Sequence, residues 1–129
     1  MKTVAVCGSR RFKKGIRKFE GELIKAGVVV FSPYLHEGGD EWEKLSPQYK
    51  RFIALGLTHD HFYKIKMADV VFVYNEGGYS GVSTTLEIGY AVAFGKPIYA
   101  LSAKDDELCR LALFREIVKT PKELIDKLK

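Results

Sequence analysis

A stretch rich in glycine and hydroxyl side chains precedes a carboxylate in this sequence. The stretch GGYSGVSTT, residues 77–85, holds three glycines and four serine or threonine hydroxyls, and Glu87 follows it closely. Glycine-rich backbone at the start of a helix favours anion binding, because a helix N-terminus presents free N–H groups. The stretch lacks the terminal lysine of a P-loop and the spacing of a dinucleotide-binding fingerprint. ATP hydrolysis and a nicotinamide cofactor are therefore not expected.

Glu87 has two interpretations, which are compatible with each other. Thr84 followed three residues later by Glu87 forms a capping-box pattern for a helix over residues 84–94. A carboxylate near a helix N-terminus is also held in its ionised form by the helix dipole, as a carboxylate nucleophile at the bottom of a ligand cleft requires.

A second anion-binding pattern lies near the N-terminus. The sequence CGSRR places Gly8 and Ser9 directly after a short apolar run, and Arg10 or Arg11 could supply positive charge. Backbone amides in such a loop, together with the start of the following helix, can receive a phosphate.

The order of apolar runs and helical patterns predicts the fold. Buried strands are predicted over residues 3–7, 28–33, 70–74, 98–101 and 114–118. Helical periodicity follows the first strand, covers residues 48–68 as one long or broken helix, and returns over 84–94 and after the TPKE start signal at Thr120. This alternation predicts one doubly wound α/β domain over residues 1–129, with a mainly parallel sheet of the Rossmann or flavodoxin-like type. Its ligand should lie at the carboxyl ends of the strands, in the loops at 8–11, 32–36 and 75–83.

Composition limits the classes of function. The chain has 129 residues, of which 47% are hydrophobic and 29% charged, and it shows no apolar run long enough for a membrane span or a signal peptide. We therefore expect a cytoplasmic protein. Cys7 and Cys109 show no metal-ligand spacing, so they are expected to be reduced thiols that behave as small hydrophobes, with no metal and no cofactor. The net charge of +5 comes partly from residues 10–18, but without an aromatic reading surface direct nucleic-acid binding is not expected.

Several of these motifs together resemble a known family. The run CGS, the sequence Ala68-Asp69-Val70-Val71, the Gly/Ser loop and the stretch EIGYA from Glu87, followed by Gly95-Lys96-Pro97, are similar to the nucleoside 2-deoxyribosyltransferase-like superfamily. This superfamily includes hydrolases of deoxynucleoside 5'-monophosphates. The resemblance spans residues 3–101.

The resemblance implies chemistry at an N-glycosidic bond. A glutamate matching Glu87 attacks C1' of the sugar, the base leaves, and water or another base resolves the glycosyl-enzyme. Asp60 or His61 would donate a proton or hold the sugar. The substrate or its 5'-phosphate would be held by Gly8, Ser9, Arg10, Ser80, Gly81 and Ser83. Tyr34, His36 or Trp42 could stack on a base. The resemblance also implies a homo-oligomer and no cofactor.

Three positions depart from the family pattern. Ala5 replaces a tyrosine that supports the glutamate, a role that Tyr79 or Tyr90 could take over. His61 occupies a position where the deoxyribosyltransferases have an aspartate. Gly81 occupies a position where the enzymes that act on free nucleosides have a second aspartate. The loss of the second aspartate favours a phosphorylated ligand.

Two alternatives remain open at this level. The first is a nucleotide-binding module of the same fold without turnover. The second is a phosphoribohydrolase of the cytokinin-activating type, although its usual Gly-Gly-x-Gly-Thr loop and paired glutamates do not match residues 77–87.

Overall fold

Five parallel strands form the centre of the molecule. The computed structural model describes residues 1–35 and 39–129. Its sheet has the order β2-β1-β3-β4-β5, and every strand pair is parallel. The strands are β1 Val4–Gly8, β2 Val30–Phe31, β3 Val70–Tyr74, β4 Ile98–Ala100 and β5 Glu116–Ile117. The predicted doubly wound α/β fold is confirmed, although the second and fifth strands are shorter than the apolar runs that predict them.

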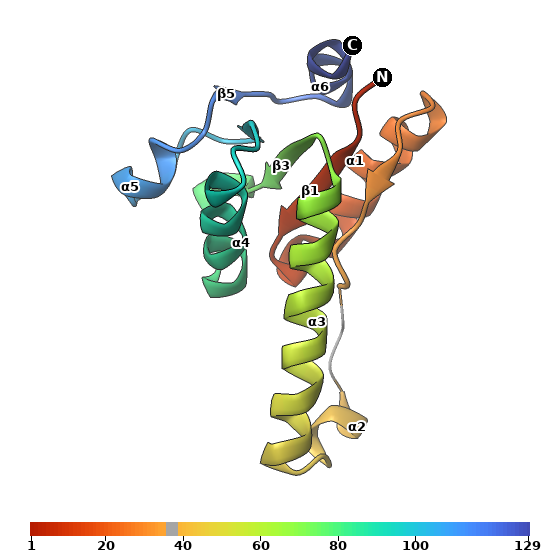
Figure 1. The fold of residues 1–129 in the computed structure, drawn as a ribbon, viewed down its shortest axis with the longest axis vertical. Coiled ribbons are helices and arrows are strands. Elements are labelled where there is room, and N and C mark those ends of the chain that lie inside the picture. The colour runs from red at the N-terminus through yellow and green to blue at the C-terminus, as the bar shows by residue number, and fades with distance from the viewer. Residues whose placement is uncertain (36–38) are drawn as a thin grey trace.

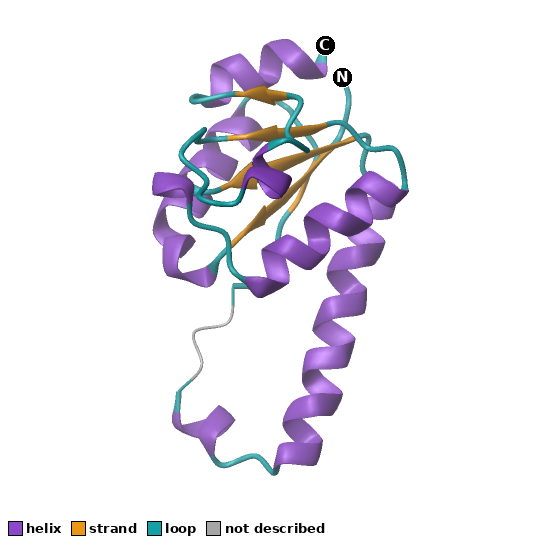
Figure 2. Cartoon of the chain, turned by 90° about the vertical axis from the view of Figure 1, so that its left-hand side faces the viewer, coloured by secondary structure: helices purple, strands orange, loops and turns teal. Residues whose placement is uncertain are grey.

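Helices cover both faces of this sheet, as Figure 2 shows. On one face lie α1 Lys13–Lys25 and α6 Pro121–Leu128, and on the other lie α3 Pro47–Met67 and α4 Val82–Ala93. Because successive strand residues point to opposite faces, β1 contributes to both cores. Val4 and Val6 pack with α1 and α6, whereas Ala5 and Cys7 pack with α3 and α4.

The helix α3 is longer than the sheet that it covers. It runs unbroken for 21 residues, so Gly56 does not interrupt it. Pro47 occupies its first position and Ser46 caps it, accepting a hydrogen bond from the Tyr49 N–H at 3.1 Å. Figure 1 shows the first half of α3 extending away from the sheet together with the short helix α2 Asp40–Glu43. Among the described residues, no helix is long and apolar enough to cross a membrane.

The connections at the carboxyl ends of the strands contain short helices that the sequence patterns do not predict. A 3-10 helix, η1 Arg10–Phe12, follows β1, and a second, η2 Glu76–Gly78, follows β3. The helix α5 Leu108–Leu111 lies between β4 and β5. The strand order reverses between β1 and β3, because the chain continues from β1 to its neighbour β2 on one side and from β3 to its neighbour β4 on the other. The crevice for a ligand therefore lies at the carboxyl ends of these two central strands.

Candidate active site

Three side chains from different elements meet beside the carboxyl ends of the central strands. Cys7 comes from β1, His61 from the second half of α3, and Glu87 from α4. The Cys7 Sγ atom lies 3.4 Å from His61 Nε2, and His61 Nε2 lies 3.7 Å from Glu87 Oε2. Cys7 and His61 are buried, while the Glu87 side chain keeps 14% of its exposure. A substrate or a metal ion that reached this cluster would therefore meet the Glu87 carboxylate.

Burial controls the charge of this cluster. It raises the pKa of Glu87 to about 8, and a hydrogen bond with Cys7 offsets part of the rise. Burial also lowers the pKa of His61 to about 4. For Cys7, burial and then the neighbouring Glu87 raise the pKa of the thiol well above its usual range. The free cluster is therefore mainly uncharged at neutral pH, which corrects the expectation that the helix dipole keeps Glu87 ionised.

The position of Glu87 in its helix explains this difference. The helix α4 begins at Val82, two residues before the predicted start, and Gly81 is its N-cap. Glu87 thus lies in the second turn, beyond the reach of a capping box, and no acidic residue occupies the first turn. The capping-box interpretation is wrong, because Gly81 replaces Thr84 at the cap and Thr85 donates instead to the Gly81 carbonyl at 2.8 Å.

The two predicted partners of Glu87 have different environments. His61 is in the cluster, and its Nδ1 atom is buried without a hydrogen-bond partner among the described residues. The Asp60 side chain is 55% exposed and forms an ion pair with Lys64 at 3.0 Å. Lys64 in turn donates to the carbonyl of Ser32, at the end of β2. The structure therefore brings His61 to Glu87 and directs Asp60 toward the end of β2.

The residues predicted to hold the substrate lie along the same edge of the sheet. Gly8 ends β1, where a Cβ atom would press on Ile16 and on the backbone of Tyr74. Ser9 caps η1 by accepting from the Arg11 N–H at 3.3 Å, and Arg10 is exposed within η1. These residues surround the end of β1, with Arg10 available to solvent.

The other predicted contacts come from the loop after β3 and from the segment after β2. The Ser80 hydroxyl is buried and has no hydrogen-bond partner among the described residues, and Gly81 and Ser83 lie at the start of α4. Ser83 is exposed. Tyr34 is exposed after β2, Trp42 lies in α2, and His36 falls outside the described residues.

The two tyrosines that could replace the missing tyrosine at Ala5 are engaged elsewhere. The Arg11 guanidinium lies over the Tyr79 ring, with its Cζ atom 3.6 Å from the ring centroid. The Tyr90 ring stacks on Phe62 with centroids 4.4 Å apart. Among the described residues, the Glu87 carboxyl group contacts Cys7 and His61.

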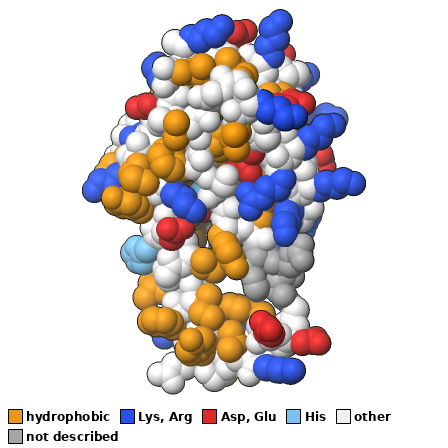
Figure 3. All heavy atoms as spheres, turned by 90° about the vertical axis from the view of Figure 1, so that its right-hand side faces the viewer, with side chains coloured by type: hydrophobic (Ala, Val, Ile, Leu, Met, Phe, Trp, Pro, Cys, Tyr) orange, Lys and Arg blue, Asp and Glu red, His pale blue; other side chains and the backbone are white. Residues whose placement is uncertain are grey.

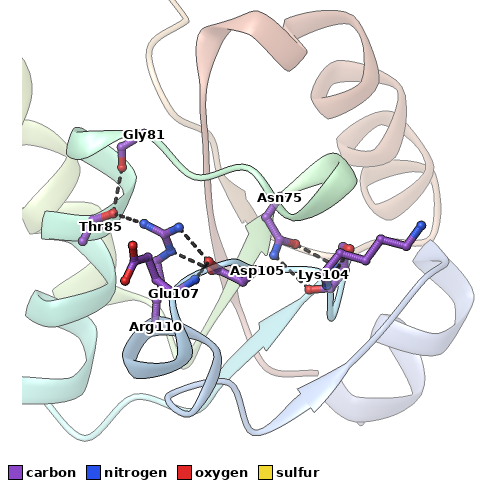
Figure 4. Close-up of polar contacts among 8 residues, drawn as sticks. Asn75, Gly81, Thr85, Lys104, Asp105, Glu107 and Arg110 are labelled. Atoms are coloured by element: carbon purple, nitrogen blue, oxygen red, sulfur yellow. Dashed lines mark hydrogen bonds and ion pairs between the residues drawn. The ribbon is translucent and has the colours of Figure 1, made fainter.

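A hydrogen-bond network fixes the loop after β4 against the start of α4 (Figure 4). Arg110 donates to both carboxylate oxygens of Asp105, at 2.6 and 2.7 Å, and to Thr85 Oγ1 at 3.0 Å. Asn75, at the end of β3, exchanges two hydrogen bonds of 2.9 Å with the backbone of Ser102. Bidentate charged pairs of this kind are strong and directional. The network holds the first turn of α4, and with it the helix that carries Glu87.

The loop after β3 also depends on close backbone contact. Gly78 has a φ of +87°, and a Cβ atom there would overlap the backbone carbonyl of Lys104. Replacing Gly78 by Ala should therefore lower the free energy of unfolding by roughly 2–4 kcal/mol, from left-handed backbone strain and displacement of the Lys104 segment.

Gly77 provides the matched control, because its φ is +64° but an added Cβ atom would meet nothing within 4 Å. Replacing Gly77 by Ala should cost only about 1 kcal/mol. Urea denaturation of both variants measures the difference. Equal losses in the two variants would show that the contact with Lys104 has no energetic weight.

The sequence patterns do not predict the position of Cys7 beside His61 and Glu87. The absence of a metal-ligand spacing led to its interpretation as a small hydrophobe, and it is indeed fully buried. Its thiol nevertheless contacts His61, which is 54 residues away in the chain. One signal in the sequence could have indicated this position. Cys7 lies two residues after Ala5 at the end of a predicted strand, so both side chains point to the same face of the sheet, which α3 and α4 cover.

The fold and this site together define a class of protein. The strand order is that of flavodoxin-like α/β proteins, and the buried Cys7–His61–Glu87 cluster lies beside their ligand crevice. No protein-family model matches the sequence, and no curated protein matches it significantly.

Three solved structures resemble the whole chain. The 2-deoxyribosyltransferase of Bacillus psychrosaccharolyticus superposes with a TM-score of 0.66 at 19% identity, over 95% of this chain and 89% of its own. A conserved protein of Enterococcus faecalis V583 superposes with a TM-score of 0.65 at 16% identity, over 99% of this chain and 97% of its own. The CMP N-glycosidase of Clostridium botulinum gives 0.54 at 24% identity, over 98% of both chains. The chain therefore shares its fold with a 2-deoxyribosyltransferase and with a CMP N-glycosidase, and this is the fold that its motifs predict.

Proposed function

We propose that this protein is an enzyme that cleaves or exchanges the N-glycosidic bond of a nucleotide, most simply a nucleoside 5'-monophosphate. The observation that carries the proposal is the meeting of Glu87 and His61 at the ligand edge of this fold, with 3.7 Å between Nε2 and Oε2. Two similar structures are of a 2-deoxyribosyltransferase and a CMP N-glycosidase, which supports the same class of reaction here.

Glu87 would act as the nucleophile in the first step. An ionised Oε atom attacks C1' of the sugar, the C1'–N bond breaks, and the bonding electrons leave with the base. Water or a second base then attacks C1' and releases Glu87. Because burial raises the pKa of Glu87, the carboxyl group must first lose a proton.

His61 lies beside that carboxyl group, with Nε2 3.7 Å from Glu87 Oε2. Burial lowers the pKa of His61 to about 4, so His61 does not retain the Glu87 proton, which passes to solvent. The neutral imidazole would instead donate a hydrogen bond from Nε2–H to the Glu87 carboxylate and hold it for attack on C1'. The departing base would take its proton from solvent.

The phosphate of the substrate would bind at the start of α4 and in the loop after β1. Gly81 leaves the first N–H groups of α4 without a side-chain cap, and the Ser80 hydroxyl is unpaired among the described residues. Arg10 would add positive charge. These features support an anionic ligand.

One experiment distinguishes the proposal from its two alternatives. Purified protein is incubated with matched ribo- and 2'-deoxynucleosides and their 5'-monophosphates, and free base is measured by chromatography. Release that requires a 5'-phosphate and also occurs with the 2'-deoxy substrates supports the proposal, whereas a strict need for ribose favours a phosphoribohydrolase. Thermal stabilisation by a nucleotide without any base release would favour the binding module, which the raised pKa of Glu87 also supports.

We also propose that the chain forms a homo-oligomer through the projecting half of α3. Tyr49, Phe52 and Leu55 are more than half exposed there. A hollow of about 540 Å³ borders Phe52 and Leu55, and Figure 3 shows hydrophobic side chains gathered at this end of the molecule. Exposed apolar area of this kind is typical of an interface.

Charge placed on this surface should separate the subunits. Light scattering coupled to gel filtration should give a multiple of the 14.6 kDa chain mass for the wild type and one chain mass for the Phe52→Glu, Leu55→Glu variant. Ile24→Glu, at an exposed apolar residue of α1, is the matched control and should keep the wild-type mass. A wild-type mass of one chain would refute the oligomer.

A further inference from the structure

We propose that Cys7, His61 and Glu87 form a binding site for a divalent transition-metal ion of the zinc type, and that the bound ion blocks Glu87. One donor atom from each residue lies within 4.8 Å of the other two. The three ligands come from β1, α3 and α4, so the packing of the fold, rather than a local loop, brings them together. The blocking of catalysis rests on the function proposed above, whereas the binding of metal does not.

The separations of the donor atoms suit such an ion. Thiolate, imidazole and carboxylate bind zinc at about 2.0–2.3 Å, so neighbouring donors of a tetrahedral site lie roughly 3.3–3.7 Å apart. The Cys7–His61 and His61–Glu87 separations are 3.4 and 3.7 Å. The donor atoms of Cys7 and Glu87 lie within 4.8 Å of each other, so metal binding would draw these two ligands together by up to about 1 Å. Three protein ligands leave a fourth position for water, as in catalytic rather than structural zinc sites.

The ligand types determine which ion the site prefers. Thiolate and imidazole favour zinc, cobalt or copper over magnesium and calcium, which prefer sets of oxygen ligands. The charges also balance, since a thiolate and a carboxylate together neutralise a divalent cation. Neutral assemblies are the ones that can be buried without a large loss of hydration. On binding, the thiol proton of Cys7 and any proton on Glu87 pass to solvent.

The orientation of His61 is compatible with metal binding. Its Nε2 atom faces both Cys7 and Glu87, and a proton on Nδ1 leaves the Nε2 lone pair free. Nδ1 is buried and has no hydrogen-bond partner among the described residues. The exposed part of Glu87 gives an ion a route to the cluster. Because the metal binds the oxygen atoms that would attack C1', metal binding and catalysis exclude each other.

Cobalt(II) is the probe for this site. Titration of the metal-free protein with cobalt(II) chloride should give a thiolate-to-cobalt charge-transfer band and tetrahedral d–d bands that saturate at one equivalent. Zinc should displace the cobalt and abolish the bands, and magnesium should not. The charge-transfer band should be absent from Cys7→Ser, and His61→Ala should weaken cobalt binding by at least roughly 100-fold.

Two matched variants serve as controls. Cys109→Ser changes the exposed cysteine, and His59→Ala changes an exposed histidine of the same helix. Both should keep the wild-type bands. Absence of bands from wild type, or bands that survive Cys7→Ser but disappear in Cys109→Ser, would overturn the proposal. Melting curves without metal show whether each variant is folded, and Glu87→Gln provides a further ligand variant that should keep the thiolate band but bind more weakly.

The inhibitory part has its own readout. Base release should disappear on addition of one equivalent of zinc and return with a chelator. Cobalt bands without base release from any substrate would support the metal site and remove the proposed function. Base release that zinc does not affect, with no cobalt bands, would remove the metal site and leave the proposed function intact.

Discussion

Replacement of Glu87 by Gln should lower the rate of base release by at least about 10³-fold, with a much smaller change in KM. The amide has nearly the same size as the carboxylic acid but cannot form the glycosyl ester. Because burial opposes the ionisation of Glu87 and an amide cannot ionise, the variant should melt near neutral pH at the temperature of the wild type or above it. Single-turnover assays of base release under metal-free conditions provide the measurement.

Glu107→Gln is the matched control for this experiment. Glu107 is an exposed carboxylate in the neighbouring loop after β4, where Figure 4 shows it beside Arg110. It should retain the wild-type rate. If Glu87→Gln releases base as fast as Glu107→Gln, Glu87 is not the nucleophile, and the Cys7–His61–Glu87 cluster has another role.

The rate of base release should rise by about 50-fold between pH 6 and pH 8 when a chelator keeps the protein metal-free. Only the ionised form of Glu87 is nucleophilic, and its pKa of about 8 leaves it mostly protonated at pH 6. His61, with a pKa of about 4, changes its charge below this range. Cys7, whose pKa burial raises well above its usual range, keeps its proton below pH 8. Glu87 is thus the group of the cluster that titrates between pH 6 and pH 8.

The free energy of unfolding should fall as pH rises from 6.5 to 8, while the rate of base release rises. The folded protein holds the Glu87 proton more tightly than the unfolded chain, so the contribution of Glu87 is complete at low pH and is lost as pH rises through its folded pKa. Between pH 6.5 and 8 this lowers the free energy of unfolding by about 2 kcal/mol. Denaturant titrations of wild type and Glu87→Gln should show this decrease only in the wild type. A flat rate profile with no stability difference would mean that Glu87 is already ionised at pH 6.

The order of elements was predictable because it rests on local signals. Apolar runs and helical periodicity identify all five strands and the four long helices, and the predicted Thr120 cap marks the start of α6 correctly. Boundaries were less accurate. The helix α4 begins at Val82 rather than at the predicted residue 84, because Gly81 and not Thr84 adopts the extended conformation of an N-cap. Short helices such as α2 and α5 have too few residues to show a period.

The candidate site was predictable only in part. Glu87 and His61 follow from motifs, and the structure places them together. Two other features depend on the rotational setting of α3 about its own axis as it packs on the sheet. These are the contacts of Cys7 with His61 and Glu87, and the exposed position of Asp60, which pairs with Lys64. No spacing within the chain encodes that rotation.

The sequence by itself determined the fold class, the edge of the sheet that holds the candidate site, and the candidate carboxylate, Glu87. Those properties follow from the periodicity of side chains and from the rule that parallel strands end at the same edge. Only the tertiary structure decided the charge of Glu87 and its neighbours. A pKa depends on the water that packing removes and on groups brought near from distant parts of the chain. Here α3 and α4 close over the end of β1, which buries Cys7 and His61 and most of the Glu87 side chain.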